Sequence, residues 1–374
     1  MTRPSNHQYW MAQALQLARK GFYSTDPNPR VGCVIVKDQT LIAQGWHEFT
    51  GGPHAEVNAI NSAPVAEASN IYVTLEPCSH QGRTPPCVDE LIKLKPESVV
   101  IAMRDPNPAV AGEGIAKLEA AGIKVVSGVL EIEARALNSG FISRMEKNRP
   151  FVRLKMAMSL DGRTALKNGQ SQWVSGEAAR IDVQRLRARS SAILTSASTV
   201  IDDNPSLNLR LSKQDLGQDI DVRQPQRVII DSQLRLSGKE KLFRSGGEVW
   251  IYTLNDNEKS IEDLSAAGAQ VTVLENKNEK HINLVELMSH LADREVNELH
   301  TECGQTLAGA LLQQGLVDEM VIYMAPKVMG NQARGCFELG EITQMSHSLD
   351  CSFEEIRRIG DDMRLTLLLN SRDR

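Results

Sequence analysis

Aromatic residues are scarce in this chain of 374 residues, since phenylalanine, tryptophan and tyrosine together make up only 4%. Proteins that hold single-stranded nucleic acid stack the bases on aromatic side chains along a basic groove. The formal net charge at pH 7 is −5, whereas nucleic-acid-binding domains usually carry a basic patch. We therefore expect no nucleic-acid partner.

Long apolar runs are also missing. No stretch approaches the ~20 apolar residues of a transmembrane helix, and residues 1–7 lack the apolar core of a signal peptide. The six cysteines are scattered along the chain, which argues against a disulfide scaffold and favours a reducing compartment. These absences predict a cytoplasmic protein with no membrane partner. The length predicts two or three domains.

The residues that are present include the side chains of a catalytic zinc site. A His-Ala-Glu triplet is followed by two cysteines, each preceded by proline. Catalytic zinc sites use three protein ligands and leave the fourth position to water, so we predict His54, Cys78 and Cys87 as ligands. In zinc-dependent base deaminases a glutamate that is not a ligand moves the protons, and Glu56 is predicted to act as this general acid/base.

The expected local structure separates these roles. Because His54 follows Gly-Gly-Pro, we expect it in the first turn of a helix that runs towards Asn61. Side chains two positions apart on a helix point away from each other, so Glu56 should stand beside the metal rather than share its face. Two other interpretations stay open. The cysteines can be small buried hydrophobes, or His80 can close a structural zinc site as fourth ligand.

Strands and helices alternate along the first half, which indicates an α/β layered sheet. Strands are expected at 31–36, 71–75, 98–103 and 124–126, and helices at 9–20, 54–61, 88–94 and 112–122. Loops after strands bind ligands in such folds, and residues 104–108 form one of them. A polar segment that ends at Pro150 marks the domain boundary, so we expect domains at 1–148 and 149–374.

The second half begins with an expected strand over 151–158. A helix is expected at 177–189, where arginines that share a face usually form a solvated surface. Further strands are expected at 191–196, 227–230, 249–254, 271–274, 299–301, 320–325 and 365–369. Residues 199–210 are expected to form a polar loop.

A turn at Gly304 precedes an expected helix over 307–314. Glycine lets the backbone approach a ligand closely, and the free N–H groups of a helix start favour a phosphate. No G-x-G-x-x-G follows a strand, so the ordinary dinucleotide-binding fingerprint is absent. If the strands before 199–210 and before Gly304 are parallel neighbours, the two loops should meet above their ends.

The motifs of the first half resemble the cytidine/deoxycytidylate deaminase superfamily. More narrowly, residues 27–32, 54–56, 76–87 and 103–108 resemble the bifunctional deaminase/reductase family of riboflavin biosynthesis. Base-editing deaminases tend to have Pro-Cys-x-x-Cys, whereas eight residues separate the two cysteines here. This longer insertion is typical of the riboflavin branch.

The second half resembles the reductase domain of the same proteins. The matching segments are 155–162, 171–173, 202–205, 207–210 and 302–304. The resemblance covers nearly the whole chain. It implies an α/β protein with an N-terminal cytidine-deaminase-like three-layer domain and a C-terminal dihydrofolate-reductase-like domain.

The resemblance also implies two consecutive reactions on a small phosphoribosylated pyrimidine. A zinc-dependent deaminase removes a ring amino group of 2,5-diamino-6-(5-phosphoribosylamino)pyrimidin-4-one as ammonia. An NADPH-dependent reductase then converts the ribosylamino product to its ribitylamino form. The family suggests a homo-oligomer. Of these features, the motif independently supports only attack by a zinc-activated water on an amidine-like ring carbon.

The implied binding residues fall into three groups. Pocket residues of the deaminase are Asn28, His47, Arg83, Asp105 and Asn107. Substrate contacts of the reductase are Ser171, Arg187, Leu207, Arg210 and Glu302. NADPH contacts are Ala157, Trp173, Thr199, Asp203 and the turn at Gly304. The arginines suit phosphate groups, and either Asp203 or Glu302 is expected to supply the proton for reduction.

Two alternatives compete with this interpretation. The first is a nucleic-acid or nucleotide deaminase with an appended non-reductase domain, which the acidic charge and the reductase motifs oppose. The second is a non-catalytic binding protein stabilised by zinc. Release of ammonia by the metal-loaded protein distinguishes the second alternative from an enzyme.

Overall fold

The computed structural model describes residues 6–62, 67–79, 86–108, 110–275 and 280–369. The chain divides into two compact units, Met1–Arg149 and Pro150–Arg374. Within the described residues, every helix is too short or too polar to cross a bilayer.

The first unit is built on a five-stranded sheet with the order β2-β1-β3-β4-β5. Its strands are β1 (Gly32–Lys37), β2 (Thr40–Trp46), β3 (Asn70–Val73), β4 (Ser98–Ile101) and β5 (Lys124–Ser127). Strand β1 runs antiparallel to both neighbours, whereas β3, β4 and β5 are parallel. The loops after β3 and β4 therefore leave the sheet at the same edge.

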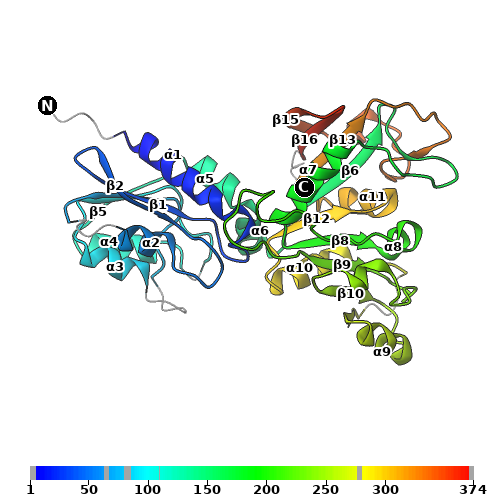
Figure 1. The fold of residues 1–374 in the computed structure, drawn as a ribbon, viewed down its shortest axis with the longest axis horizontal. Coiled ribbons are helices and arrows are strands. Elements are labelled where there is room, and N and C mark those ends of the chain that lie inside the picture. The colour runs from blue at the N-terminus through cyan, green and yellow to red at the C-terminus, as the bar shows by residue number, and fades with distance from the viewer. Residues whose placement is uncertain (1–5, 63–66, 80–85, 109, 276–279, 370–374) are drawn as a thin grey trace. The chain divides into compact units, whose positions relative to one another are not determined.

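Helices cover both faces of this sheet (Figure 1). They are α1 (His7–Ala18), η1 (Arg19–Tyr23), α2 (Ala55–Asn61), α3 (Cys87–Lys93), α4 (Glu113–Ala120), α5 (Glu131–Leu137) and α6 (Ser139–Lys147). One core lies between the sheet and α1, α5 and α6, and a second lies between the sheet and α2, α3 and α4. Helix α2 packs so closely that a Cβ on Gly45 of β2 would lie 2.4 Å from the backbone nitrogen of Ala59.

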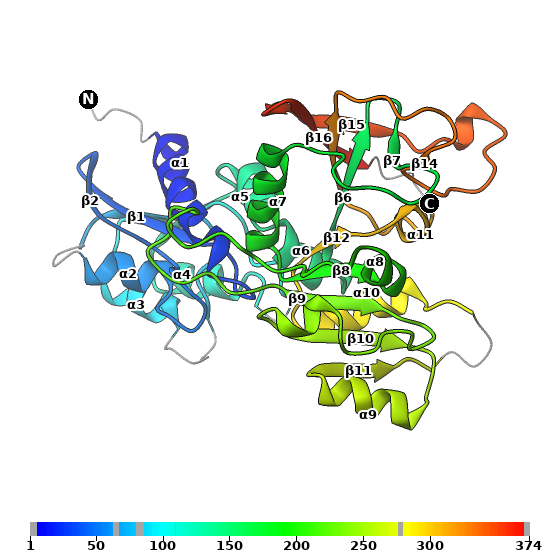
Figure 2. The ribbon, with the colours of Figure 1, turned by 45° about the vertical axis from the view of Figure 1, so that its right-hand side comes forward.

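The second unit contains a nine-stranded sheet with the order β11-β10-β9-β8-β12-β6-β13-β16-β15. Its strands are β6 (Phe151–Ser159), β8 (Ala192–Ser196), β9 (Gln226–Ile230), β10 (Val249–Thr253), β11 (Ala269–Val273), β12 (Glu298–Glu302), β13 (Glu319–Ala325), β15 (Cys351–Ile359) and β16 (Asp362–Leu369). Figure 2 shows β9, β10 and β11 following one another at one end of this sheet. Only the pairings that involve β16 are antiparallel. A separate ribbon pairs β7 (Arg163–Ala165) with β14 (Arg334–Gly335).

Helices also pack on both faces of the large sheet. They are α7 (Glu177–Arg189), α8 (Ala197–Asp203), η2 (Lys241–Arg244), α9 (Glu258–Ala266), α10 (Leu284–Asp293) and α11 (Gln305–Gln313), whereas the residues of η3 (Met345–His347) are exposed. The largest core lies under α10 and α11, and separate clusters lie under α7 and under α8 and α9. The predicted α/β class and the three-layer first unit are confirmed.

The predicted loop over 199–210 is partly wrong, because α8 occupies its first residues. The Ser196 side chain accepts a hydrogen bond from the Thr199 backbone, which caps the helix. Ala197 and Val200 are buried beneath it. The polar residues that suggested a loop form the outer surface of this short helix. Helices α5, α6, α9 and α10 and strand β15 were not expected from the sequence either.

Candidate functional site

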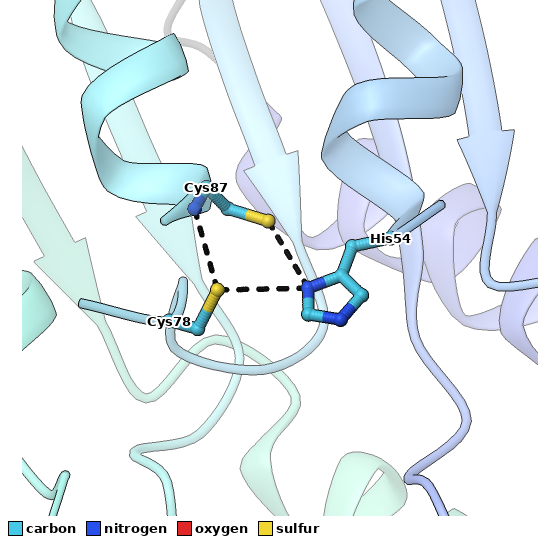
Figure 3. Close-up of side chains that lie close together, drawn as sticks. All are labelled: His54, Cys78 and Cys87. Atoms are coloured by element: carbon cyan, nitrogen blue, oxygen red, sulfur yellow. Dashed lines mark hydrogen bonds between the residues drawn. The ribbon is translucent and has the colours of Figure 1, made fainter. Parts of the chain in front are cut away.

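Three segments of the first unit bring His54, Cys78 and Cys87 together, and we call this group the metal cluster (Figure 3). His54 precedes α2, Cys78 follows β3, and Cys87 is the first residue of α3. The Nδ1 atom of His54 lies 3.2 Å from Sγ of Cys87 and 3.5 Å from Sγ of Cys78. The backbone N–H of Cys87 donates to Sγ of Cys78 at 3.3 Å.

This geometry fits a zinc ion. A tetrahedral zinc with bonds of about 2.0 Å to nitrogen and 2.3 Å to sulfur separates these atoms by about 3.5 Å. The thiol of Cys87 and the imidazole of His54 lower the pKa of Cys78 to about 4, despite its partial burial. Hydrogen bonding to Cys78 and burial raise the pKa of Cys87. The cluster therefore already stabilises one thiolate, the form of cysteine that binds metals.

Glu56 lies in the first turn of α2, beside the metal cluster, and is only 3% exposed. Burial and the neighbouring Cys78 raise its pKa to about 7. A carboxyl group with a pKa near neutrality can both accept and donate a proton. This protonation behaviour suits a group that shuttles protons.

The predicted position of His54 within the helix is wrong. His54 is the N-cap of α2, with extended backbone angles of φ −72° and ψ 163°. Helical spacing therefore does not determine the relative directions of His54 and Glu56. The extended residue turns His54 towards the cysteines, while the first turn of α2 brings the Glu56 side chain into contact with Cys87.

Asn28 and His47 are neighbours in the structure and adjoin His54. His47 Nδ1 lies 3.0 Å from the carbonyl of Pro53, and its Nε2 lies 3.1 Å from Nδ2 of Asn28. Because a carbonyl can only accept, Nδ1 carries the proton and Nε2 accepts from Asn28. The rings of His47 and His54 stand edge to face with centroids 5.6 Å apart. The hydrogen bond from His47 to Pro53 therefore fixes the backbone directly before His54.

Asp105 and Asn107 share the loop after β4. Asp105 Oδ1 accepts from the Asn107 backbone at 2.8 Å. Glu76, only 3% exposed, accepts from the backbone N–H groups of Asp105 and Gly112 at 3.2 Å and 3.0 Å. Glu76 therefore fixes the loop that contains Asp105 and Asn107. No sequence pattern predicted this role, although Glu76 lies two positions before Cys78. Arg83 and His80 lie outside the described residues.

In the second unit, all ten residues implied for the reductase line one cavity of about 1480 Å³, the reductase cavity. They are Ala157, Ser171, Trp173, Arg187, Thr199, Asp203, Leu207, Arg210, Glu302 and Gly304. Strands β8 and β12 are parallel neighbours. A Cβ on Gly304 would lie 4.0 Å from Oγ1 of Thr199. The expected meeting of the two loops above the strand ends is therefore confirmed.

An ion pair crosses this cavity wall from α7 to β12. Nε and Nη2 of Arg187 donate to Oε1 and Oε2 of Glu302 at 2.5 Å and 3.0 Å, and Nη1 donates to the Asn208 carbonyl at 2.9 Å. Burial alone would raise the pKa of Glu302, but Arg187 and His300 outweigh it and hold this pKa well below its usual value. Arg187 itself is 7% exposed, so it does not belong to a solvated helix face.

Three further residues lie at this site although no sequence pattern gave them a role there. Lys155 of β6 lines the cavity, and burial lowers the pKa of its ammonium group although Glu302 acts in the opposite direction. The Arg180 guanidinium lies 4.5 Å from the centre of the Trp173 ring. His300 lies behind Glu302. The available signal for Lys155 was a lysine between Leu154 and Met156 in an expected strand.

Comparison with known families and proteins assigns each unit. The family model described as "Cytidine and deoxycytidylate deaminase zinc-binding region" matches residues 4–103, and that described as "RibD C-terminal domain" matches residues 150–365. The riboflavin biosynthesis protein RibD of Escherichia coli (strain K12) is 45% identical over 367 residues, covering 96% of this chain and 99% of that protein. The Haemophilus influenzae protein is 43% identical, covering 96% of both chains.

Solved structures agree over nearly the full length. Acinetobacter baumannii RibD has a TM-score of 0.89 at 41% identity, covering 98% of this chain and 99% of that chain. A deaminase/reductase from Thermotoga maritima has a TM-score of 0.85 at 33% identity, covering 97% and 99%. The alternatives of an appended non-reductase domain and of a non-catalytic zinc protein are therefore wrong. The chain belongs to the RibD family, the bifunctional zinc-dependent deaminases and NADPH-dependent reductases of riboflavin biosynthesis.

Proposed function

We propose that residues 1–148 deaminate 2,5-diamino-6-(5-phosphoribosylamino)pyrimidin-4-one and that residues 149–374 reduce the deaminated product. The Thermotoga maritima relative is described as a diaminohydroxyphosphoribosylaminopyrimidine deaminase/5-amino-6-(5-phosphoribosylamino)uracil reductase, which supports this substrate pair. One observation carries the proposal. The chain combines a His-Cys-Cys cluster beside a buried glutamate with a separate cavity lined by arginines and by the glycine turn before α11.

In the deaminase, His54, Cys78 and Cys87 are the proposed zinc ligands and Glu56 the general acid/base. Bound zinc lowers the pKa of a water molecule and so supplies a nucleophile. Glu56 accepts a proton from the attacking water and returns it to the substrate, so that the ring carbon gains an oxygen and the amino group leaves as ammonia. Its pKa of about 7 supports both steps.

The remaining deaminase residues are proposed to bind the pyrimidine. Asn28 and His47 lie next to the metal cluster, and their mutual hydrogen bond gives them fixed orientations. Asp105 and Asn107 lie in the loop that Glu76 holds. Arg83 is proposed to meet the substrate phosphate, since a guanidinium forms strong charge-assisted bonds to phosphate.

In the reductase, Ser171, Arg187, Leu207, Arg210 and Glu302 are the proposed substrate contacts. Arg187 already pairs with Glu302, so of these two arginines Arg210 is the one proposed to meet the substrate phosphate. Burial and the neighbouring Arg187 lower the pKa of Arg210, which favours an anion beside it. The carboxylate of Glu302 suits hydrogen-bond donors of the substrate.

Ala157, Trp173, Thr199, Asp203 and Gly304 are the proposed NADPH contacts. NADPH supplies the hydride that reduces the ribosyl carbon. Gly304 caps α11 without a side chain, so a phosphate can approach the free N–H groups of the helix start.

Arg187 keeps Glu302 ionised, so Glu302 is unsuited to donate the proton that accompanies the hydride. Asp203, the other expected donor, therefore stays a proposed donor, and we add Lys155, which lines the same cavity and has a lowered pKa that eases release of a proton.

We also propose a cytoplasmic homo-oligomer that acts on a small molecule and binds neither nucleic acid nor membrane. Its six cysteines are all free thiols, which supports a reducing compartment. The acidic net charge of −5 supports the absence of a nucleic-acid partner.

The test is incubation of the zinc-loaded protein with the diaminopyrimidinone, with and without NADPH. Ammonia should appear in both reactions, and NADPH oxidation should follow only after ammonia release begins. The Glu56→Gln variant should oxidise NADPH with the deaminated substrate but not with the diamino substrate. NADPH oxidation without prior ammonia release would contradict the proposed order.

A further inference from the structure

One face of β12 carries a row of polar side chains. Glu298, His300 and Glu302 alternate along the strand, so they point to the same side of the sheet. Arg187 and Arg189 of α7 contact the two ends of this row, at Glu302 and Glu298. The row therefore runs beneath α7, from the reductase cavity into the interior of the unit.

His300 occupies the middle of this row and is 0% exposed. Its Nε2 lies 3.4 Å from Oε1 of Glu302, the oxygen that also accepts from Nε of Arg187. This contact is long and imperfectly aligned for a hydrogen bond, and neither ring nitrogen has another hydrogen-bond partner among the described residues. A buried polar group without a partner costs free energy, so the carboxylate of Glu302 is the contact that compensates for this ring.

Burial is the main reason that the His300 ring stays neutral. Burial lowers the pKa of His300, Glu302 opposes this effect, and Arg153 and Arg187 add to it. The ionisable residues around it are Glu298 and Glu302 on its own strand, Arg153 and Lys155 on β6, and Arg187 on α7. A neutral imidazole has one N–H and one lone pair. With an anion beside Nε2, the favoured tautomer carries its proton there.

We propose that His300 is a positioning residue of the reductase, which donates from Nε2 to Oε1 of Glu302 and fixes the carboxylate for the substrate. Arg187 holds Glu302 from the α7 side, and His300 holds it from the strand. Together they restrict the rotation of a side chain that is 15% exposed at the cavity. This inference rests on the substrate contact proposed for Glu302.

Two substitutions separate hydrogen bonding from simple filling of space. In His300→Gln the amide nitrogen can take the place of Nε2, whereas His300→Met has a similar size and no donor. We expect His300→Met to raise the KM for the deaminated pyrimidine about tenfold, the effect of losing a hydrogen bond to a charged group. His300→Gln should stay near the parent value. The Kd of NADPH and the rate of ammonia release should be unchanged in both variants.

A parental KM in His300→Met, or an equal rise in His300→Gln and His300→Met, would overturn the inference. If the Kd of NADPH shows that His300→Met disturbs the fold, His300→Asn replaces it, because the shorter amide does not reach Glu302. Glu302→Gln is measured in parallel. A parental KM in Glu302→Gln would refute the proposed contact of Glu302 itself. An impaired Glu302→Gln beside a parental His300→Met would refute only the role of His300.

Discussion

Glu56 in the first unit and Glu302 in the second are both largely buried glutamates, but their pKa values shift in opposite directions. Glu56 has thiols and an imidazole as neighbours, and its pKa rises to about 7. Glu302 receives two hydrogen bonds from Arg187, and its pKa falls well below the usual value. Burial favours the neutral carboxyl in both cases, and a paired cation reverses that preference.

The contrast fits the different tasks that we propose for the two glutamates. A group that must accept and return a proton works best with a pKa near the working pH. A group that must bind hydrogen-bond donors of a substrate works best as a permanent anion in a fixed orientation.

The largest effect is expected from Glu56→Gln. The amide keeps the size of the side chain but cannot shuttle a proton, so deamination should fall by about 10²–10⁴-fold. Zinc content should remain at the parent level, because no ligand changes. Ammonia release and metal analysis of the purified variant test this, with reduction of the deaminated substrate as the internal control. Deamination at the parental rate would remove Glu56 from the proposed role.

Arg187→Met should remove the cation that makes Glu302 differ from Glu56. Breaking a buried ion pair on one side costs about 3–5 kcal/mol, and we expect the free energy of unfolding to fall by about 3 kcal/mol at neutral pH, because Glu302 retains slight exposure. Denaturant unfolding followed in the reductase unit measures the difference. Lys213→Met is the control, since its partner Asp221 has a side chain that is 94% exposed.

The same variant makes a prediction about pH. A carboxyl whose pKa is depressed in the folded state contributes stability above its unfolded pKa, about 4.3 for glutamate. That contribution is lost as the pH falls from there towards the folded pKa. The difference in stability between the parent and Arg187→Met should therefore shrink below about pH 4. A constant difference across this range would show that the ion pair is not its source.

Arg210→Ala should weaken phosphate binding without disturbing the Arg187–Glu302 pair. One lost charge-assisted bond costs about 1.5–3 kcal/mol, so the KM of the reduction should rise roughly ten- to a hundredfold. The Kd of NADPH and deamination should stay nearly unchanged. Arg185→Ala, an exposed position on α7, is the matched control. Loss of NADPH affinity with a normal substrate KM would show that the two ends of the cavity are assigned backwards.

The smallest effect is expected from separating the two units. Each has its own hydrophobic clusters, so residues 1–149 expressed alone should fold, bind zinc and release ammonia at nearly the parental rate. Circular dichroism and metal analysis establish folding before activity is measured. A folded, zinc-loaded and inactive fragment would contradict the independence of the two sites.

Much of the deaminase centre was predictable because its residues are close together in the chain. His54, Cys78 and Cys87 span 34 residues, and the chemistry of their side chains restricts the metal they can bind. The inferred position of Glu56 beside this group agrees with the structure, but the helical argument for it was wrong, because His54 lies outside the helix. The capping conformation of one residue is not visible in a residue pattern.

The prediction of the residues that line the reductase cavity depended more on the family resemblance than on local sequence patterns. Arg187 and Glu302 are 115 positions apart, and their pairing requires α7 to cross the strand that ends at Glu302. The same arrangement explains why no sequence pattern predicted a role for Lys155 or His300. The neighbours of a lysine or a histidine within a strand are known only once the pairing with the adjacent strand is known. Helix α8 was missed because its polar residues resemble a loop until the burial of Val200 is known.

The sequence alone determined the residue types of the metal cluster and the alternation of strands and helices, because ligand chemistry and local periodicity act over short distances along the chain. It also indicated the family, through the resemblance of motifs along nearly the whole chain. Only the tertiary structure decided which buried carboxyl stays near neutrality and which is held as an anion. That choice depends on whether a cation lies within a few ångströms. For Glu302 the cation comes from α7, and its distance is set by the packing of that helix on the sheet.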